Sequence, residues 1–208
     1  MAVSDRPRVY VVDDDEALLA SLARVLIRAG YDVETYASPR AFLHRPRPRV
    51  TSCVLLDLDM PELSGLDLQA ALAREDGPTS VVFMTAHASV PSAVRALKAG
   101  AADFLEKPFE SPMLLGAIEV ALRRSEELVR AGEARARARE RLSRLTPRER
   151  DVCDRIAAGS RSRQIAGALG IAETTVGLHR ARVMKKTGAS SVAELVLLVR
   201  QADGDEAE

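Results

Sequence analysis

The sequence contains no tryptophan, and aromatic residues make up only 3% of its 208 residues, so a core must be mainly aliphatic. Its two cysteines, Cys53 and Cys153, lie far apart and lack the paired spacing of zinc ligands. We expect both to be reduced core residues of a cytoplasmic protein. No apolar stretch reaches eighteen residues, and Asp5 and Arg6 interrupt the start of the chain where a signal peptide would be apolar. We therefore expect neither a membrane span nor secretion.

The net charge is zero, but the charges are unevenly distributed. Residues 1–122 hold 17 acidic and 12 basic side chains, a net charge of −5. Residues 123–145 hold 4 and 8, a net charge of +4, and residues 146–200 hold 5 and 10, a net charge of +5. Residues 201–208 form a short acidic tail with four carboxylates. This division suggests a metal or phosphate site followed by a module that binds a polyanion.

Short apolar strands alternate with helices through residues 1–122. The run from Cys53 to Asp57 is continuously apolar up to its last residue, which is typical of a strand buried on both faces of a parallel sheet. β-branched runs, helical periodicity and capping residues extend the pattern. Strands are also expected at 8–12, 32–36, 80–84 and 103–106, and helices at 17–29, 64–75 and 90–99 and from Pro39 and Ser111. The pattern predicts an α/β doubly wound (βα)5 domain with right-handed crossovers.

Four of the predicted strands end at polar residues. Asp13 and Asp14 follow the first strand, and the other ends carry Asp57, Thr85 and Lys107. Parallel strands place these ends at one edge of the sheet, where open α/β sheets carry their chemistry. Clustered carboxylates repel one another unless a cation lies between them, and hard oxygen ligands without histidine or cysteine favour Mg²⁺. A carboxylate in such a site can attack a phosphoryl group whose oxygens the cation and a lysine neutralise.

Each of these residues also has a simpler interpretation. Acids that follow a strand are common at a helix N-terminus, where they compensate the helix dipole. Thr85 alone is typical of a strand end, and Lys107 alone is typical of a surface. The order and spacing of the whole set favour a joint site.

The chain resembles the receiver domain of two-component response regulators from residue 8 to about residue 122. The matching residues are Asp13-Asp14, Asp57 with Met60-Pro61 and Gly65, Thr85-Ala86 and Lys107-Pro108-Phe109. The resemblance implies the strand order 2-1-3-4-5 and a cis peptide bond between Lys107 and Pro108.

The same resemblance implies a role for each site residue. Asp57 is the phospho-acceptor. Asp13, Asp14, Asp57 and the backbone carbonyl of Asp59 hold Mg²⁺. Thr85 donates its hydroxyl to the phosphoryl group, Lys107 pairs with that group, and Phe104 swings inward when Thr85 moves. The receiver can then catalyse its own phosphotransfer and dephosphorylation, although the protein is not expected to be an enzyme with an external substrate.

The composition changes to arginine, alanine and glutamate at residues 123–145. These residues favour a helix, either an extension of the fifth helix or a partly frayed linker, although a basic interaction arm is an alternative. Thr146-Pro147 and Glu149 then form a capping box that opens a second domain at residues 146–200, and Ser191 and Glu194 repeat the device. Helices at 163–169 and 173–186, joined through Gly170, indicate a helix-turn-helix within an all-α four-helix domain.

Residues 145 to about 200 resemble the LuxR-type helix-turn-helix domain of the NarL/FixJ family. The matching residues are Leu145 to Arg150, Ala157 to Gly159, Gln164 to Ala166, Leu169 to Ile171, Thr175-Val176, His179-Arg180 and Val192 to Leu195. The second helix would enter the major groove and contact phosphates through Thr174, Thr175, Arg180, Arg182, Lys185 and Lys186. The resemblance places base reading at Gly177, Leu178 and Ala181. Gly177 stands where lysine is common and Ala172 where a serine N-cap is common, so readout is expected to depend on Arg180, apolar contacts or DNA shape. We expect His179 to be buried and hydrogen-bonded.

Two alternatives belong to other classes of function. Asp57-Leu58-Asp59 is also the nucleophile pattern of aspartyl-phosphate phosphatases, although those carry it after the first strand rather than the third. Residues 146–200 could instead form a protein-interaction bundle, whose binding would lack the steep salt dependence of DNA binding.

The sequence therefore predicts a phosphorylation-activated DNA-binding transcriptional regulator. The resemblance implies a sensor histidine kinase, promoter DNA and RNA polymerase as partners. It also implies a homodimer that forms on phosphorylation through the fourth helix and fifth strand, at residues 91–98 and 103–104.

Overall fold

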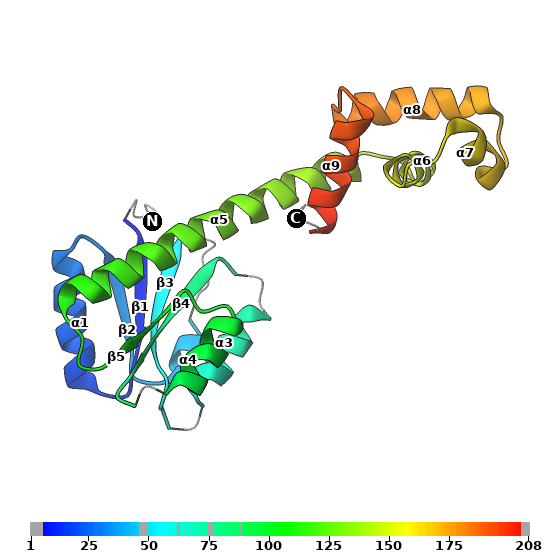
Figure 1. Cartoon of the computed structure of the whole chain (residues 1–208). Coiled ribbons are helices and arrows are strands. Elements are labelled where there is room, and N and C mark those ends of the chain that lie inside the picture. Colours follow the sequence, from blue (N-terminus) through cyan, green and yellow to red (C-terminus); the bar gives the residue numbers. More distant parts are fainter. Residues whose placement is uncertain (1–5, 46–49, 62, 75–76, 88, 205–208) are drawn as a thin grey trace. The chain divides into compact units, whose positions relative to one another are not determined.

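The structure is a computed structural model that describes residues 6–45, 50–61, 63–74, 77–87 and 89–204. The chain divides into two compact units, Met1–Arg130 and Ala131–Glu208. The first unit is α/β and the second is all-helical, as predicted (Figure 1). Among the described residues, no helix combines the length and apolar character that crossing a bilayer requires.

Five parallel strands form the sheet of the first unit in the order β2-β1-β3-β4-β5, which confirms the predicted order (Figure 1). All six residues of β3 are buried, because this central strand has paired neighbours on both sides and helices over both faces. The strands are β1 (Arg8–Val12), β2 (Asp32–Tyr36), β3 (Ser52–Asp57), β4 (Thr79–Thr85) and β5 (Asp103–Glu106).

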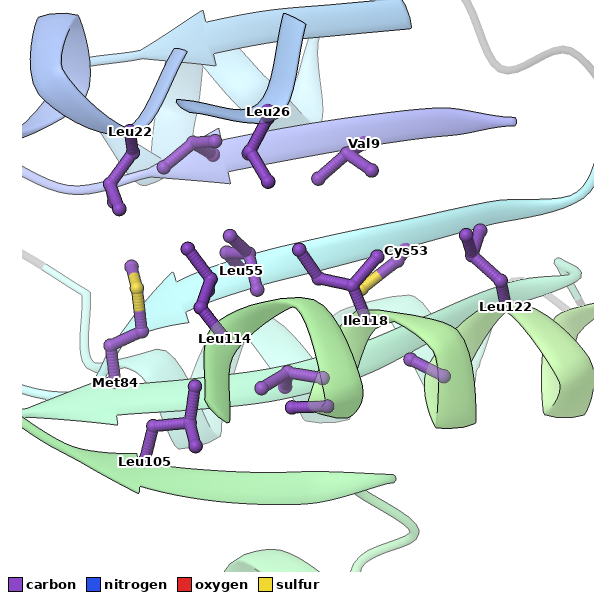
Figure 2. Close-up of a cluster of buried hydrophobic side chains, with 14 of the residues drawn as sticks. Val9, Leu22, Leu26, Cys53, Leu55, Met84, Leu105, Leu114, Ile118 and Leu122 are labelled. Atoms are coloured by element: carbon purple, nitrogen blue, oxygen red, sulfur yellow. The ribbon is translucent and has the colours of Figure 1, made fainter. Parts of the chain in front are cut away.

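Helices cover both faces of this sheet. α1 (Glu16–Arg28) and the first turns of α5 (Ser111–Ser143) pack on one face. α2 (Pro39–Leu43), α3 (Gly65–Ala73) and α4 (Val90–Lys98) pack on the other. Figure 2 shows the first core, where leucine and isoleucine side chains of α1 and α5 point onto the sheet. Alternate strand residues face opposite layers, so one short strand contributes to both cores.

The helix boundaries differ slightly from the prediction because capping residues stand outside the helices. Asp15 caps α1, where its Oδ1 accepts hydrogen bonds from the backbone N–H groups of Ala17 (2.9 Å) and Leu18 (3.1 Å). Both interpretations of this acidic run therefore apply. Asp15 caps the helix, and Asp13 lies at the edge of the sheet. Ser64 caps α3 by accepting from the N–H of Asp67 at 3.2 Å. The predicted last residue of that helix, Glu75, lies outside the described residues.

Four helices complete the second unit: α6 (Pro147–Ala157), α7 (Ser162–Leu169), α8 (Glu173–Thr187) and α9 (Val192–Asp203). Gly170 ends α7 in the left-handed conformation (φ 63°), which allows the tight turn into α8. Ile165, Val176 and Val183 are fully buried between α7 and α8, and Leu169 packs beside them partly buried. The predicted tail at 201–208 is partly helical, since α9 continues to Asp203, and residues 205–208 lie outside the described residues.

One of the two predicted capping boxes is complete. Thr146 accepts from the N–H of Glu149 (3.3 Å), and the Glu149 carboxylate accepts from the N–H of Thr146 (2.8 Å). The second box is wrong in one half. Ser191 accepts from the N–H of Glu194 (3.1 Å), but the Glu194 carboxylate turns to Ser190, where both the backbone N–H and the hydroxyl donate to it. Two donors on Ser190 compete successfully with one on Ser191.

The arginine-rich segment is helical, because α5 continues without interruption from Ser111 to Ser143. This favours the extension of the fifth helix over the frayed linker. Its last turns belong to the second unit, where Ala138 and Leu142 are buried in the core.

Among the glycines described in the first unit, Gly65 has the least room for a side chain, and this gives a test of the packing. A Cβ at this position would overlap the backbone carbonyl oxygen of Asp57 and lie 2.9 Å from the Phe83 ring. We predict that Gly65→Ala destabilises the first unit by about 1–3 kcal/mol through overpacking. Urea unfolding can be followed by tyrosine fluorescence, since all three tyrosines (Tyr10, Tyr31 and Tyr36) lie in this unit.

Gly116→Ala is the matched control for this change. Gly116 lies inside α5, where a Cβ would meet nothing within 4 Å. It should raise stability by up to about 1 kcal/mol through helix propensity. Equal unfolding midpoints for Gly65→Ala and the wild type would contradict the packing argument.

Candidate functional site

The carboxyl ends of the strands bring the predicted residues to one edge of the sheet. Asp57 is the last residue of β3 and Thr85 the last of β4, while Asp13 and Lys107 follow β1 and β5 directly. The parallel register aligns Asp57 with Met84, one residue before Thr85. Asp13, Asp57 and Thr85 are buried, with 1%, 6% and 0% of their surface exposed. Asp14 and Asp59 are exposed at the same edge.

Lys107 joins the two buried carboxylates. Its Nζ lies 2.6 Å from Asp13 Oδ2 and 2.6 Å from Asp57 Oδ1, and it donates a hydrogen bond to each. The second oxygen of Asp57, Oδ2, accepts from the backbone N–H of Asp59 at 2.9 Å. Residues almost 100 positions apart thus form one charge network, as their places after β1, β3 and β5 predicted.

The charges in this network are not fully balanced. Burial raises the pKa of the Asp57 carboxyl, and the nearby Lys107 opposes this effect without cancelling it. Burial lowers the pKa of the Lys107 ammonium, but its hydrogen bonds to Asp13 and Asp57 raise the pKa more, so it lies above its ordinary value. Lysine therefore stays charged at neutral pH. A raised aspartate pKa shows a carboxylate that further positive charge would stabilise.

The Thr85 hydroxyl is directed to Asp59 rather than to Asp57 in this arrangement. It donates to Asp59 Oδ2 at 3.1 Å, and Thr85 Oγ1 accepts from the backbone N–H of His87 at 3.1 Å. The expected role of Asp59 was to bind the metal through its backbone carbonyl, or to form part of the Asp57-Leu58-Asp59 pattern in the phosphatase alternative. The hydrogen bond to Thr85 was missed, although the Asp57-Leu58-Asp59 spacing offered a signal that both carboxylates lie near the edge.

Two further expectations concern the loop and strand beside the site. The Lys107–Pro108 peptide bond is cis, as the resemblance implied. Phe104 on β5 is partly buried, and its ring centroid lies 6.4 Å from that of Phe83 on β4. The side chain therefore packs at the edge of the second core, with part of its surface still exposed.

The donor set suits a hard cation. Asp13, Asp14 and Asp57 offer carboxylate oxygens, Asp59 offers a backbone carbonyl, and no soft ligand is among the predicted set. The unbalanced charge on Asp57 points the same way. Among the described residues, no three acidic, histidine or cysteine side chains converge as a ready cage, since Lys107 lies between Asp13 and Asp57. The residues present fit Mg²⁺ as a cation shared between carboxylates at an open edge.

One face of α8 in the second unit is exposed. The side chains predicted to meet DNA lie on this helix, and Leu178 is 62% exposed. Within the described part of the chain, no carboxylate lies within ion-pair distance of Arg180, Arg182 or Lys185. Ala172 provides no side-chain cap, as its identity predicted. Of the predicted contacts, Thr174, Gly177, Leu178, Ala181, Arg182 and Lys185 are exposed, and Thr175, Arg180 and Lys186 are half-buried.

Two residues of α8, Lys186 and His179, have surroundings that differ from those expected from the sequence. Lys186 Nζ lies 2.6 Å from Glu149 Oε2 on α6, so the ammonium expected to meet a phosphate is already paired with a carboxylate. His179 is half-buried rather than buried, and its Nδ1 has no hydrogen-bond partner among the described residues. The prediction of a hydrogen-bonded histidine is therefore wrong, because no acceptor or donor of a neighbouring helix reaches that nitrogen.

An acidic receiver edge joined to a helix-turn-helix unit defines a class of protein that takes up a phosphoryl group and binds DNA. Comparisons with known proteins agree. Residues 9–119 match the response regulator receiver domain, and residues 143–199 match the luxR family of bacterial regulatory proteins. The chain belongs to the response regulators of the NarL/FixJ family.

The chain covers most of the length of the relatives that it resembles. The chain is 40% identical to Nodulation protein W of Bradyrhizobium diazoefficiens over 93% of this chain and 85% of that protein. It is 41% identical to the transcriptional regulatory protein FixJ of Azorhizobium caulinodans over 96% of both. Among solved structures, the response regulator StyR is 43% identical with a TM-score of 0.74, covering 94% of this chain and 99% of that one.

These findings establish the function at the level of the family. The protein is a phosphorylation-activated, DNA-binding transcriptional regulator of a two-component system. They support neither the phosphatase nor the protein-interaction alternative, and they describe a regulator rather than an enzyme.

The Glu149–Lys186 pair predicts how the second unit responds to acid. The Glu149 carboxylate is held at a pKa of about 2, chiefly by its hydrogen bond from Lys186 and then by that from Thr146. Because the folded pKa lies below the usual value near 4.5, the pair's contribution is complete above that value and is lost as pH falls towards 2.

Comparison with Glu149→Gln tests this prediction, since glutamine keeps an acceptor for Thr146 but has no charge. The wild type should be more stable than the variant at pH 6, and the difference should close between pH 4.5 and 2. Urea titrations read from the methyl resonances of Val152 and Val176 would measure it. A difference that does not change with pH would contradict the ionic role of Glu149.

Proposed function

We propose that Asp57 is the residue that accepts the phosphoryl group from a sensor histidine kinase. The observation that carries the proposal is Lys107 Nζ at 2.6 Å from both Asp57 and Asp13. In the transfer, an Asp57 carboxylate oxygen forms a bond to phosphorus while the bond from phosphorus to the kinase histidine nitrogen breaks. The electron pair stays with the imidazole. The same site performs the transfer from a small phosphoryl donor and the later hydrolysis by water.

The site has to supply positive charge to neutralise the oxygens of the arriving phosphoryl group. Lys107 can move its ammonium from the Asp57 oxygen to an oxygen of the arriving phosphoryl group, because a long lysine side chain needs only a small rotation. Bound Mg²⁺, held by Asp13, Asp14, Asp57 and the carbonyl of Asp59, would neutralise the phosphoryl oxygens. The raised pKa of the Asp57 carboxyl supports a need for that charge.

Thr85 and Phe104 form the switch in this proposal. The Thr85 hydroxyl, now donating to Asp59, transfers its hydrogen bond to a phosphoryl oxygen on Asp57. Movement of Thr85 opens space in β4, and Phe104, partly buried against Phe83, turns inward to fill it. The phosphoryl group thus acts as a ligand that binds one of two states more tightly.

We propose that phosphorylation produces a symmetric dimer of receivers through α4 and β5. Three large apolar side chains of α4 are exposed: Val90 by 79%, Val94 by 43% and Leu97 by 49%. An isologous interface brings the same patch of both copies together and removes these side chains from water. Dimerisation then raises the effective concentration of the second DNA-binding domain at its half-site.

The output of the dimer is promoter recognition. α8 enters the major groove, where Arg180, Arg182 and Lys185 neutralise phosphates and Leu178 contacts base edges. A regulator bound there meets RNA polymerase, and the cytoplasm is the compartment in which both partners are expected.

The first test concerns the phospho-acceptor. With acetyl phosphate and Mg²⁺, intact-mass spectrometry should find one phosphoryl group on the wild-type chain and none on Asp57→Asn. Asp59→Asn is the control, because it keeps the backbone carbonyl and should still be phosphorylated. Phosphorylation of the Asp57→Asn chain would place the acceptor elsewhere.

The second test concerns the dimer face. With Mg²⁺ and beryllofluoride, a phosphoryl mimic, light scattering should detect a dimer of the wild type. The double variant Val94→Asp/Leu97→Asp should stay monomeric because four carboxylates would meet across the interface. Met113→Asp, which changes an exposed side chain of α5, should dimerise as the wild type does. A dimer of the double variant would move the interface to another surface.

A further inference from the structure

We propose that Arg141 is a positioning residue for DNA recognition, because it fixes the C-terminal end of α8 to the last turns of α5. The proposal rests on the assignment of α8 as the helix that enters the major groove. Arg141 thereby has a function within the arginine-rich segment, for which the composition predicts only a helical linker.

The last turns of α5 are part of the core of the second unit. Ala138 is 1% exposed and Leu142 is 3% exposed, and both pack with Val152 and Leu195 of α6 and α9. A solvated linker helix would leave every face exposed. Burial of two positions four residues apart fixes one face of α5, so the side chains on its flanks have defined positions as well.

Two arginines on those flanks contact the ends of other helices. Arg141 Nε donates to the backbone carbonyl of Thr187, the last residue of α8, and its Nη2 lies beside Gly188. Arg139 Nε donates to the carbonyl of Ala202 near the end of α9 at 2.8 Å. The last carbonyls of a helix lack intrahelical donors and carry the negative end of its dipole. A guanidinium is well suited to both needs.

An anchor at the C-terminal end matters for α8 because this helix lacks two local sources of stability. Ala172 gives no side-chain cap at the N-terminus, and Gly177 lowers the helix propensity in the middle. The C-terminal end is held by Arg141 on Thr187 and by the Glu149–Lys186 pair. Without Arg141, one of these two anchors is lost, and α8 can tilt away from the orientation in which its exposed side chains meet DNA.

The test compares full-length variants that remove one positive charge from the same helix. Arg141→Gln removes the anchor. Arg137→Gln is the matched control, because Arg137 pairs with Glu133 one turn away on the same helix and its side chain is 66% exposed. The probe is a duplex selected from a random pool by the beryllofluoride-treated wild type, together with an unselected duplex.

We expect Arg141→Gln to bind the selected duplex about tenfold more weakly, with less than a twofold change for Arg137→Gln. The slope of the logarithm of affinity against the logarithm of salt should be unchanged, because a positioning residue neutralises no phosphate. Amides in the last turn of α8 should exchange faster with solvent. A slope reduced by about one, with equal losses on both duplexes, would make Arg141 a phosphate contact and overturn the proposal, as would unchanged affinity.

Arg141→Lys keeps the test decisive if Arg141→Gln does not fold. Lysine keeps the charge but lacks the Nε donor, so a positioning role predicts a loss of about threefold or more, whereas no loss would overturn the proposal. Arg182→Gln tests the assignment of α8 separately. If it leaves affinity and salt slope unchanged, the groove assignment fails. If it weakens binding while both Arg141 variants bind normally, the positioning role alone fails.

Discussion

Two carboxylates share one ammonium group at the edge of a parallel sheet, and the rest of the receiver depends on this contact. Asp13 and Asp57 are both buried, so without Lys107 each would keep one backbone hydrogen bond but lose the positive charge that compensates for its burial. The sheet makes the contact possible, because parallel strands deliver their carboxyl ends to one side. The same geometry leaves Asp57 short of positive charge, as its raised pKa indicates, and this suits the role of phospho-acceptor that we propose for it.

The sequence predicted the sheet and its edge because both depend on short-range patterns. A buried apolar run such as Cys53 to Asp57 indicates a strand. The polar residue at the end of that run then lies at the carboxyl edge of the parallel sheet. The hydrogen bond from Thr85 to Asp59 could not be predicted in this way. A hydroxyl can rotate towards any of several acceptors, and the choice depends on side-chain positions that no local pattern contains.

The arginine-rich segment shows the same limit in the second unit. Composition predicted a helix, and α5 is a helix throughout. Composition does not show which residues the arginines of this segment contact, because that depends on the direction in which each side chain leaves the helix. Residues two apart on a helix point about 200° apart, since each residue turns the helix by about 100°. Arg139 and Arg141 therefore reach different helices, α9 and α8, while Ala138 and Leu142 face the core between them.

A helix that is proposed to enter a DNA groove must keep one face exposed, so its stability has to come from its other face and its ends. Side chains that are proposed to meet DNA cannot also pack against the protein, so the exposed Leu178 and Arg182 contribute little to the folded state. Val176, Val183 and Thr187 are buried on the inner face, and Met184 packs beside them partly buried. Charged contacts at the far end of the helix add to this packing without occupying the face proposed to read DNA. A cation bound to the last carbonyls therefore suits α8 better than further packing along its length.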